Sequence, residues 1–324
     1  MHLENEQIPK RVGLIGVGLM GAVLAKHFLA GGLEVVGYDI DSGRLDWFRQ
    51  MGGRSATSPK DVAEAVSHVV FSLPDTTVVR EVVEGAHGIL RAPRKPSYII
   101  DTTTGDPDDT VVLAEKLAQS QVSLLDATVS GASSQLEKRE AVFMVGGEPT
   151  AYEACTGLLQ LLADEVFYVG PSGCGSKAKL ATNLVLGLNR LVLAEGIVFA
   201  EKLGLPLDTF LRLLKVSPAH SAAVDVKGEK MLRNDFEPVS RIRQHHKDVC
   251  LMLKHAKRHN QRLPLSDVHL AILERAMAAG DGELDTSAVI REIRRGASKH
   301  SISSLTRRRK VHENKKDLFT SQFS

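Results

Sequence analysis

The stretch that decides the fold is RVGLIGVGLMGAVLAKHFLAGGLEVVGYD, residues 11–39. Its first five residues form a short apolar run typical of a buried strand, and a second apolar run covers residues 33–38. Between these runs, a glycine-rich turn leads into an apolar-periodic helical segment that ends at Gly31 and Gly32. The order of strand, glycine-rich turn, helix and strand predicts a complete βαβ unit.

Three glycines in this stretch have the spacing GxGxxG: Gly16, Gly18 and Gly21. In a strand-to-helix turn, the first permits a tight turn, the second lets the backbone approach a pyrophosphate, and the third permits close helix packing. Asp39 ends the second strand, where a carboxylate accepts hydrogen bonds from both ribose hydroxyls and repels a 2′-phosphate. The unit therefore predicts a dinucleotide site that favours NAD, while Arg44 leaves NADP open because an arginine accommodates that phosphate.

Strands and helices continue to alternate as far as about residue 172. Strand-like runs cover 68–73, 98–101, 122–126, 141–145 and 166–169, with helical patterns at 61–65, 77–84, 107–120 and 149–162. This alternation predicts an α/β fold with a largely parallel, doubly wound sheet, whose ligands lie at the carboxyl ends of the strands. Leu73 and Pro74 occupy one such end and Thr102 to Thr104 another, although ordinary turn chemistry also explains both segments.

From Gly173 onward the pattern changes to long helical segments. This change predicts a Rossmann-type domain over 1–172 followed by an all-α domain over 173–296. The first long helix carries Lys179 and Asn183, which share one face because they are four residues apart. A lysine near a helix amino terminus lies against the helix dipole, which lowers the pKa of its amine and suits proton transfer. Without further motifs, a solvated lysine remains the simpler interpretation.

The composition of the chain excludes a protein that is disordered throughout. The chain has 324 residues, of which 43% are hydrophobic and 25% charged, as in ordinary globular proteins. Its net charge of +2 gives no general affinity for nucleic acid, but residues 297–324 hold seven Lys and Arg against two acidic side chains. We expect this tail to be disordered, with nucleic-acid binding as its alternative role.

The compartment is predicted from what the chain lacks. Its three cysteines have no disulfide or CxxC spacing, and its polar amino terminus is unlike a signal peptide, so we expect a cytoplasmic protein. The most apolar stretch, residues 183–200, is interrupted by Asn189, Arg190 and Glu195. That interruption favours a buried helix over a membrane span.

Four motifs together make the chain resemble the β-hydroxyacid dehydrogenase family, which includes 3-hydroxyisobutyrate dehydrogenase and tartronate semialdehyde reductase. They are GLIGVGLMG at 13–21, DATVSG at 126–131, GCGSKAKLATN at 173–183, and Lys247–Asp248. Their order and approximate spacing match the family over residues 11 to about 296. The resemblance implies NAD or NADP as cofactor, no metal, a small carboxylic-acid substrate, and a homodimer or homotetramer.

The resemblance also implies roles for matching positions. Lys179 is the proton-transfer residue, and Asn183 helps to hold both the lysine and the substrate. Ser130 and the backbone at Gly131 anchor the substrate carboxylate. The cofactor-binding residues are Gly16, Gly18, Leu19, Met20, Gly21, Asp39, Leu73, Pro74, Thr104 and Lys247.

Four positions depart from the family pattern. Thr128 replaces a proline, Ala132 a glycine, Arg139 a glycine and Thr182 an asparagine, which leaves the identity of the substrate open. Two alternative functions also stay open: a non-catalytic dinucleotide-binding scaffold with a nucleic-acid-docking tail, and an imine reductase. The retained Lys179 argues against both, since relatives of either kind usually lack it.

Several histidines and one arginine of the second half lie outside these motifs. His255 and His259 are four residues apart on a helical segment, but the basic side chains around them favour a solvated face over a zinc site. His245 and Arg243 lie close to Lys247 in the sequence. Local packing is the simpler interpretation of His245, and a second anionic group of the substrate is a possible partner of Arg243.

Overall fold

The structure is a computed structural model that describes residues 8–296. The chain forms two compact units that divide between Asn183 and Leu184, inside helix α8 (Cys174–Lys202), and each unit is described by itself. The first unit contains the β-sheet, whereas the regular elements described in the second are helices. The predicted fold class is therefore confirmed. The basic tail at 297–324 lies outside the described residues.

Eight strands form one sheet in the order β3-β2-β1-β4-β5-β6-β7-β8. They are β1 (Arg11–Ile15), β2 (Glu34–Tyr38), β3 (Arg54–Ser55), β4 (His68–Phe71), β5 (Tyr98–Asp101), β6 (Ser123–Ser130), β7 (Val142–Gly146) and β8 (Glu165–Gly170). All neighbouring strands are parallel except β6 and β7. Strand order reverses at β1, so the carboxyl ends of β1 and β4 flank the crevice where doubly wound sheets bind their ligands.

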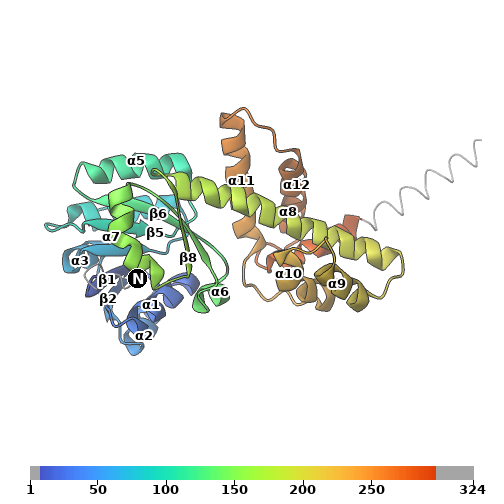
Figure 1. The fold of residues 1–324 in the computed structure, drawn as a ribbon, viewed down its shortest axis with the longest axis horizontal. Coiled ribbons are helices and arrows are strands. Elements are labelled where there is room, and N and C mark those ends of the chain that lie inside the picture. Colours follow the sequence, from blue (N-terminus) through green and yellow to red (C-terminus); the bar gives the residue numbers. More distant parts are fainter. Residues whose placement is uncertain (1–7, 297–324) are drawn as a thin grey trace, which may run out of the picture. The chain divides into compact units, whose positions relative to one another are not determined.

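Helices cover both faces of the sheet (Figure 1). On one face, α1 (Leu19–Ala30), α2 (Ser42–Gln50) and α7 (Pro149–Gln160) contribute Phe28, Phe48 and Leu158 to a buried apolar core. On the other, α3 (Pro59–Ala65), α4 (Thr76–Glu84) and α5 (Pro107–Ala118) contribute Val62, Val83 and Leu117 to a second core. The sheet is thus apolar on both sides, which explains why its strands are continuous apolar runs.

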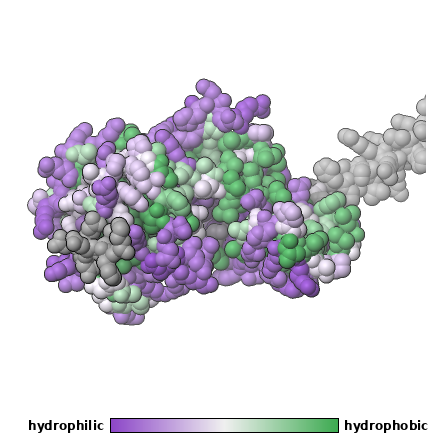
Figure 2. All heavy atoms as spheres, viewed as in Figure 1, coloured by the Kyte–Doolittle hydropathy of each residue, from purple (hydrophilic) through white to green (hydrophobic). Residues whose placement is uncertain are grey.

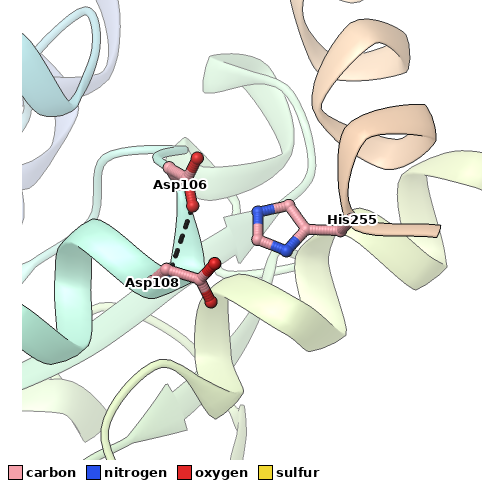
Figure 3. Close-up of side chains that lie close together, drawn as sticks. All are labelled: Asp106, Asp108 and His255. Atoms are coloured by element: carbon pink, nitrogen blue, oxygen red, sulfur yellow. Dashed lines mark hydrogen bonds between the residues drawn. The ribbon is translucent and has the colours of Figure 1, made fainter. Parts of the chain in front are cut away.

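Short polar side chains define where several of these helices begin. The N-caps of α2, α3, α4 and α5 accept hydrogen bonds from first-turn N–H groups, and they are Asp41, Ser58, Asp75 and Asp106. Figure 3 shows the cap of α5, in which the Asp108 N–H donates to the Asp106 carboxylate at 3.0 Å. Pro107 follows at the first helical position, where its missing N–H costs nothing.

Strand β7 is predicted at 141–145, but its antiparallel orientation and three short elements are not evident from sequence patterns. A parallel pair needs a crossover of about a dozen residues or more. The link between β6 and β7 is shorter, and it holds only the helix α6 (Ser133–Glu137). Neither α6 nor the two-residue β3 is long enough to show a period, and α2 carries one buried residue, Phe48.

The second unit begins within α8 and contains α9 (Leu207–Val216), α10 (Ala222–Arg233), α11 (Ile242–Arg258), α12 (Pro264–Ala278) and a 3-10 turn, η2 (Thr286–Ala288). Within residues 8–296, α8 is the one helix whose length and composition would allow it to cross a membrane. Half of its apolar window (50%) is buried inside the protein, as in the core helix of a folded domain. This agrees with the predicted buried helix.

Candidate active site

The glycine-rich loop joins β1 to α1. Gly16 has φ of +93°, and a Cβ there would lie 2.2 Å from the Ser72 carbonyl oxygen, so no other residue fits. Gly18 is the N-cap of α1 and provides no side-chain cap to the first turn, which contains Leu19, Met20 and Gly21. The N–H groups of this turn therefore suit an anion such as a pyrophosphate, as the motif predicts.

Asp39 follows β2 and is buried beside this loop, with 7% of its surface exposed. Its carboxylate accepts hydrogen bonds from the N–H of Val17 at 2.7 Å and from that of Asp41 at 2.9 Å. The Arg44 guanidinium lies 3.5 Å from the same carboxylate. A cavity of about 490 Å³ opens next to these residues, and it is lined by Val17, Gly18, Leu19, Ala22, Asp41, Gly43, Arg44 and Trp47.

The loops after β4 and β5 are connected by a buried threonine. The Leu73 N–H donates to the Thr103 hydroxyl at 3.2 Å, and the Thr103 N–H donates to the Asp101 carboxylate at 2.9 Å. Burial raises the pKa of Asp101 to about 7, even though the hydrogen bonds from Thr103 act in the opposite direction. The predicted cofactor residues Leu73, Pro74 and Thr104 thus lie in two loops that the hydrogen bond between Leu73 and Thr103 joins.

Lys179 and Asn183 lie on the second and third turns of α8 and are both buried, with 8% and 7% of their surface exposed. The start of this helix is anchored to β6. Asp126 accepts hydrogen bonds from the N–H groups of Gly173 at 2.9 Å and Ser176 at 2.7 Å. The carboxylate thus serves as the cap of a helix from which it is far removed in sequence.

Strand β6 links this anchor to the predicted substrate residues. Asp126, Thr128 and Ser130 alternate along the strand and therefore project from one face of the sheet. The Thr128 hydroxyl is fully buried and donates to the Gly175 carbonyl at 2.8 Å. Ser130 ends the strand, and Gly131 follows it with φ of +144°. One strand therefore contacts the helix of Lys179 and also carries the predicted carboxylate anchor.

Lys247 belongs to the helical unit, on α11, and its Nζ lies 4.0 Å from the Asp248 carboxylate. The other predicted site residues belong to the sheet unit, whereas Lys247 belongs to the helical unit. Neighbouring His245 is buried and packs against His269, with the rings tilted and their centroids 5.0 Å apart. Arg243 forms an ion pair with Glu283 at 2.7 Å.

Known proteins match this chain along almost its entire described length. The NAD binding domain of 6-phosphogluconate dehydrogenase matches residues 11–170, and the NAD-binding domain of NADP-dependent 3-hydroxyisobutyrate dehydrogenase matches residues 173–293. The chain is 30% identical to 2-(hydroxymethyl)glutarate dehydrogenase of Eubacterium barkeri, covering 87% of this chain and 94% of that protein. The chain belongs to the β-hydroxyacid dehydrogenase family.

Two further relatives support this membership. The chain is 29% identical to 2-hydroxy-3-oxopropionate reductase of Escherichia coli, over 87% of this chain and 97% of the relative. The crystal structure of 3-hydroxyisobutyrate dehydrogenase from Salmonella typhimurium superposes with a TM-score of 0.79 at 27% identity, covering 87% and 99% of the two chains. This β-hydroxyacid dehydrogenase is therefore an NAD(P)-dependent oxidoreductase, and its relatives do not favour the scaffold or imine-reductase alternatives.

The structure accounts for three of the departures from the family pattern. Arg139 replaces a glycine at φ of +64°, and its guanidinium offsets the strain by binding Asp164 and two backbone carbonyls. Thr182 donates to the Ala178 carbonyl at 3.0 Å, four residues back along α8. Thr128 gains the hydrogen bond to Gly175 that a proline cannot make. These contacts lie within the protein, so they give no information about the substrate.

Some buried polar residues of this dehydrogenase are not evident from its motifs. Asp101 and Thr103 support the loops predicted to bind the cofactor. Their hydrogen bonds in the folded protein show this role, and no sequence motif indicates it. Arg190 is buried in the helical unit, where burial lowers its pKa to about 10. The prediction of a solvated histidine face on α11 is wrong for His255, which is 8% exposed, although His259 is exposed. His255 lies on the same face of α11 as the buried Asp248 and Met252, which precede it by seven and three residues.

Proposed function

We propose that this protein interconverts a small β-hydroxy acid and its semialdehyde or keto-acid partner, with Lys179 as the general acid and base. The observation that carries the proposal is a buried lysine on a helix whose first turn is hydrogen-bonded to the strand of Ser130. The named relatives act on 3-hydroxyisobutyrate, 2-(hydroxymethyl)glutarate and 2-hydroxy-3-oxopropionate. Each of these compounds has a hydroxyl or oxo group on the carbon β to a carboxylate.

Oxidation of such an acid removes a hydride from the carbinol carbon and a proton from its hydroxyl, which leaves a carbonyl group. Bound NAD⁺ supplies the acceptor for the hydride. The neutral Lys179 amine takes the hydroxyl proton and becomes an ammonium. In the reverse direction, this ammonium hydrogen-bonds the carbonyl oxygen and returns the proton. Asn183 holds the lysine and the substrate, while Ser130 and the backbone at Gly131 bind the carboxylate.

A substrate panel tests this proposal directly. Short 3-hydroxy acids are incubated with the protein and with NAD or NADP, and the absorbance of the reduced nicotinamide is followed. Lys179→Met should lower kcat by about 10²–10⁴-fold, the usual contribution of a positioned acid–base group. Lys177→Met is the matched control, because Lys177 is exposed and lies two residues before Lys179 on α8. The proposal fails if no acid of the panel is oxidised, or if the two variants lose the same activity.

We also propose that NAD is preferred over NADP. Asp39 is held beside the glycine-rich loop by two backbone N–H groups, in position to bind ribose hydroxyls and to repel a 2′-phosphate. The loop residues Gly16 to Gly21, the loops at Leu73, Pro74 and Thr104, and Lys247 would hold the rest of the cofactor.

Trp47 offers a measurement of this preference that does not depend on activity. It is the single tryptophan of the chain, and it lines the cavity beside Asp39. We expect titration of its fluorescence to show about tenfold tighter binding of NAD than of NADP, a difference of about 1.4 kcal/mol. Asp39→Asn should remove most of the difference. Equal affinities in the unmodified protein would contradict the preference.

Finally, we propose a cytoplasmic homo-oligomer, a homodimer or homotetramer, assembled through α8. Val185, Val192 and Phe199 recur every seven residues along this helix and are 57%, 67% and 64% exposed. Figure 2 shows that apolar surface gathers over the helical unit. Val192→Glu should reduce the mass measured by sedimentation, whereas Val112→Glu, at a 57% exposed valine of α5, should not. A monomeric unmodified protein would contradict the proposal.

A further inference from the structure

We infer that Thr128 is a positioning residue, which holds the first turn of α8, and thereby Lys179, against the strand that ends at Ser130. This inference rests on the proposed function, since it assigns to Thr128 a part in proton transfer by Lys179. Thr128 touches neither of the predicted substrate anchors. It acts through the backbone of Gly175.

The contact joins two elements that are distant in the sequence. The Thr128 hydroxyl is 0% exposed and donates to the Gly175 carbonyl at 2.8 Å, across 47 residues of chain. A second carbonyl, that of Met144 on β7, lies 3.5 Å from the same hydroxyl. The shorter contact decides the orientation of the hydroxyl, because hydrogen bonds between oxygens are normally well below 3.5 Å.

The Gly175 carbonyl also accepts a hydrogen bond within helix α8. In an α-helix, each carbonyl accepts from the N–H four residues further along, so this one accepts from Lys179. Thr128 therefore binds the peptide group to which the backbone of Lys179 is hydrogen-bonded. A shift of that carbonyl would move the base of the lysine side chain with it.

The surrounding contacts leave this turn little freedom. Asp126, two residues before Thr128, binds the N–H groups of Gly173 and Ser176. A Cβ on Gly175 would lie 2.0 Å from the Asp126 carbonyl oxygen, so the helix backbone rests directly on the strand. On one face of β6, the Thr128 hydroxyl thus binds a carbonyl and the Asp126 carboxylate binds two N–H groups at the start of α8.

The anchor ties the proton-transfer group to the predicted carboxylate site. Ser130 is the next residue on the same face of β6 after Thr128. A substrate carboxylate bound at Ser130 and a hydroxyl proton removed by Lys179 belong to one small molecule, so the spacing between the two residues sets the geometry of the reaction. Small displacements of such groups lower reaction rates strongly. The proline usual in the family has no hydroxyl, so this contact is a property of this chain.

Thr128→Val tests the inference, because valine has nearly the shape of threonine but carries a methyl group in place of the hydroxyl. The Gly175 carbonyl keeps its helical partner, so the variant should fold. We expect kcat for a substrate found in the panel to fall about tenfold, within the range for loss of one buried hydrogen bond. The KM for that acid and the affinity for NAD, followed by Trp47 fluorescence, should stay within about twofold. The solvent deuterium isotope effect on kcat should rise, because proton transfer becomes slower.

Two variants serve as controls. Thr128→Ser restores the hydroxyl and should recover most of kcat, which a purely steric role would not predict. Thr156→Val removes a hydroxyl that donates to a helical carbonyl at the same distance, 2.8 Å, but in α7. It should leave kcat and the isotope effect unchanged. Hydrogen exchange should be faster in peptides from 174–183 in Thr128→Val, and unchanged there in Thr156→Val.

The outcomes separate this inference from the proposed function. If the unmodified protein oxidises no hydroxy acid, the proposed function fails, and the role of Thr128 in it fails as well. If the protein is active but Thr128→Val keeps its kcat, the positioning role alone is overturned. The same conclusion follows if Thr128→Ser is as impaired as Thr128→Val, or if exchange of 174–183 does not change.

Discussion

Buried carboxylates in the two units of this protein have opposite surroundings. In the sheet unit, Asp101 and Asp126 face each other across β5 and β6, and burial raises the pKa of both. In the helical unit, Asp285 is 0% exposed, but it binds the Lys227 ammonium at 2.8 Å. Although burial alone would raise the pKa of Asp285, its hydrogen bonds lower it to about 2. The comparison teaches that the partner, rather than burial, decides whether a buried carboxylate stays charged.

Replacing the buried carboxylate by an amide should affect the stability of the protein differently in the two units. Asp285→Asn leaves the buried ammonium of Lys227 without its counter-charge, which should cost about 3–5 kcal/mol of unfolding free energy. Arg190 loses part of its charge compensation as well. Urea denaturation followed by circular dichroism, which reports mainly the helices, measures the loss. Adding Lys227→Met should recover part of it, and a double variant no more stable than the single one would show that the pair is not the cause.

The pH dependence of this pair has a definite sign. Because the pKa of Asp285 is lower in the folded protein than in the unfolded chain, its contribution is complete above pH of about 4. It is lost as the pH falls toward about 2, the pKa in the folded protein. The Asp285→Asn variant should therefore lose stability less steeply in this acid range than the unmodified protein.

Asp101 should show the opposite pH dependence. The folded protein holds this proton up to pH of about 7, whereas the unfolded chain loses it near 4, so stability falls as the pH rises between these values. Asp101→Asn keeps an oxygen that accepts from Thr103 and cannot ionise. We expect it to be more stable than the unmodified protein at pH 8 by on the order of 4 kcal/mol, and equally stable at pH 4. Trp47 lies in the sheet unit, so its fluorescence follows this unit in urea. Parallel pH profiles of the two proteins would contradict the raised pKa.

These carboxylates also mark the limit of sequence-based prediction. The segment from Arg11 to Asp39 predicts its two strands and its helix to within a few residues, because its periodicity and glycine spacing are local properties. Lys179 and Asn183 are equally local, since they lie four residues apart on one helix. The supports of the site are not local: Asp126 reaches Gly173 across 47 residues and Ser176 across 50. No periodicity relates such positions, so only the folded structure shows that strand and helix are joined.

Asp126→Asn should lower the unfolding free energy by an intermediate amount. The carboxylate accepts from two N–H groups with its two oxygens, whereas an asparagine offers one oxygen and turns an NH₂ toward the other donor. We expect a loss of about 1–3 kcal/mol, the cost of a buried donor left without its acceptor. Trp47 fluorescence in urea gives the stability, and hydrogen exchange of 174–183 shows whether the loss is at the start of α8. A loss of stability without faster exchange there would mean that the carboxylate does not anchor the helix.

An exposed ion pair completes the comparison and should give the smallest effect. Arg139 binds Asp164 at 2.5 Å, but Asp164 is 71% exposed, so water competes for its charge. Asp164→Ala should change the unfolding free energy by less than about 0.5 kcal/mol, as is usual for surface pairs. Arg139→Gly should also be nearly neutral, because glycine removes the strain of the left-handed backbone while losing the bonds of the guanidinium to Leu161 and Gln160. Losses that approached those of Asp285→Asn would show that a short distance, rather than exclusion of water, decides the strength of an ion pair in this protein.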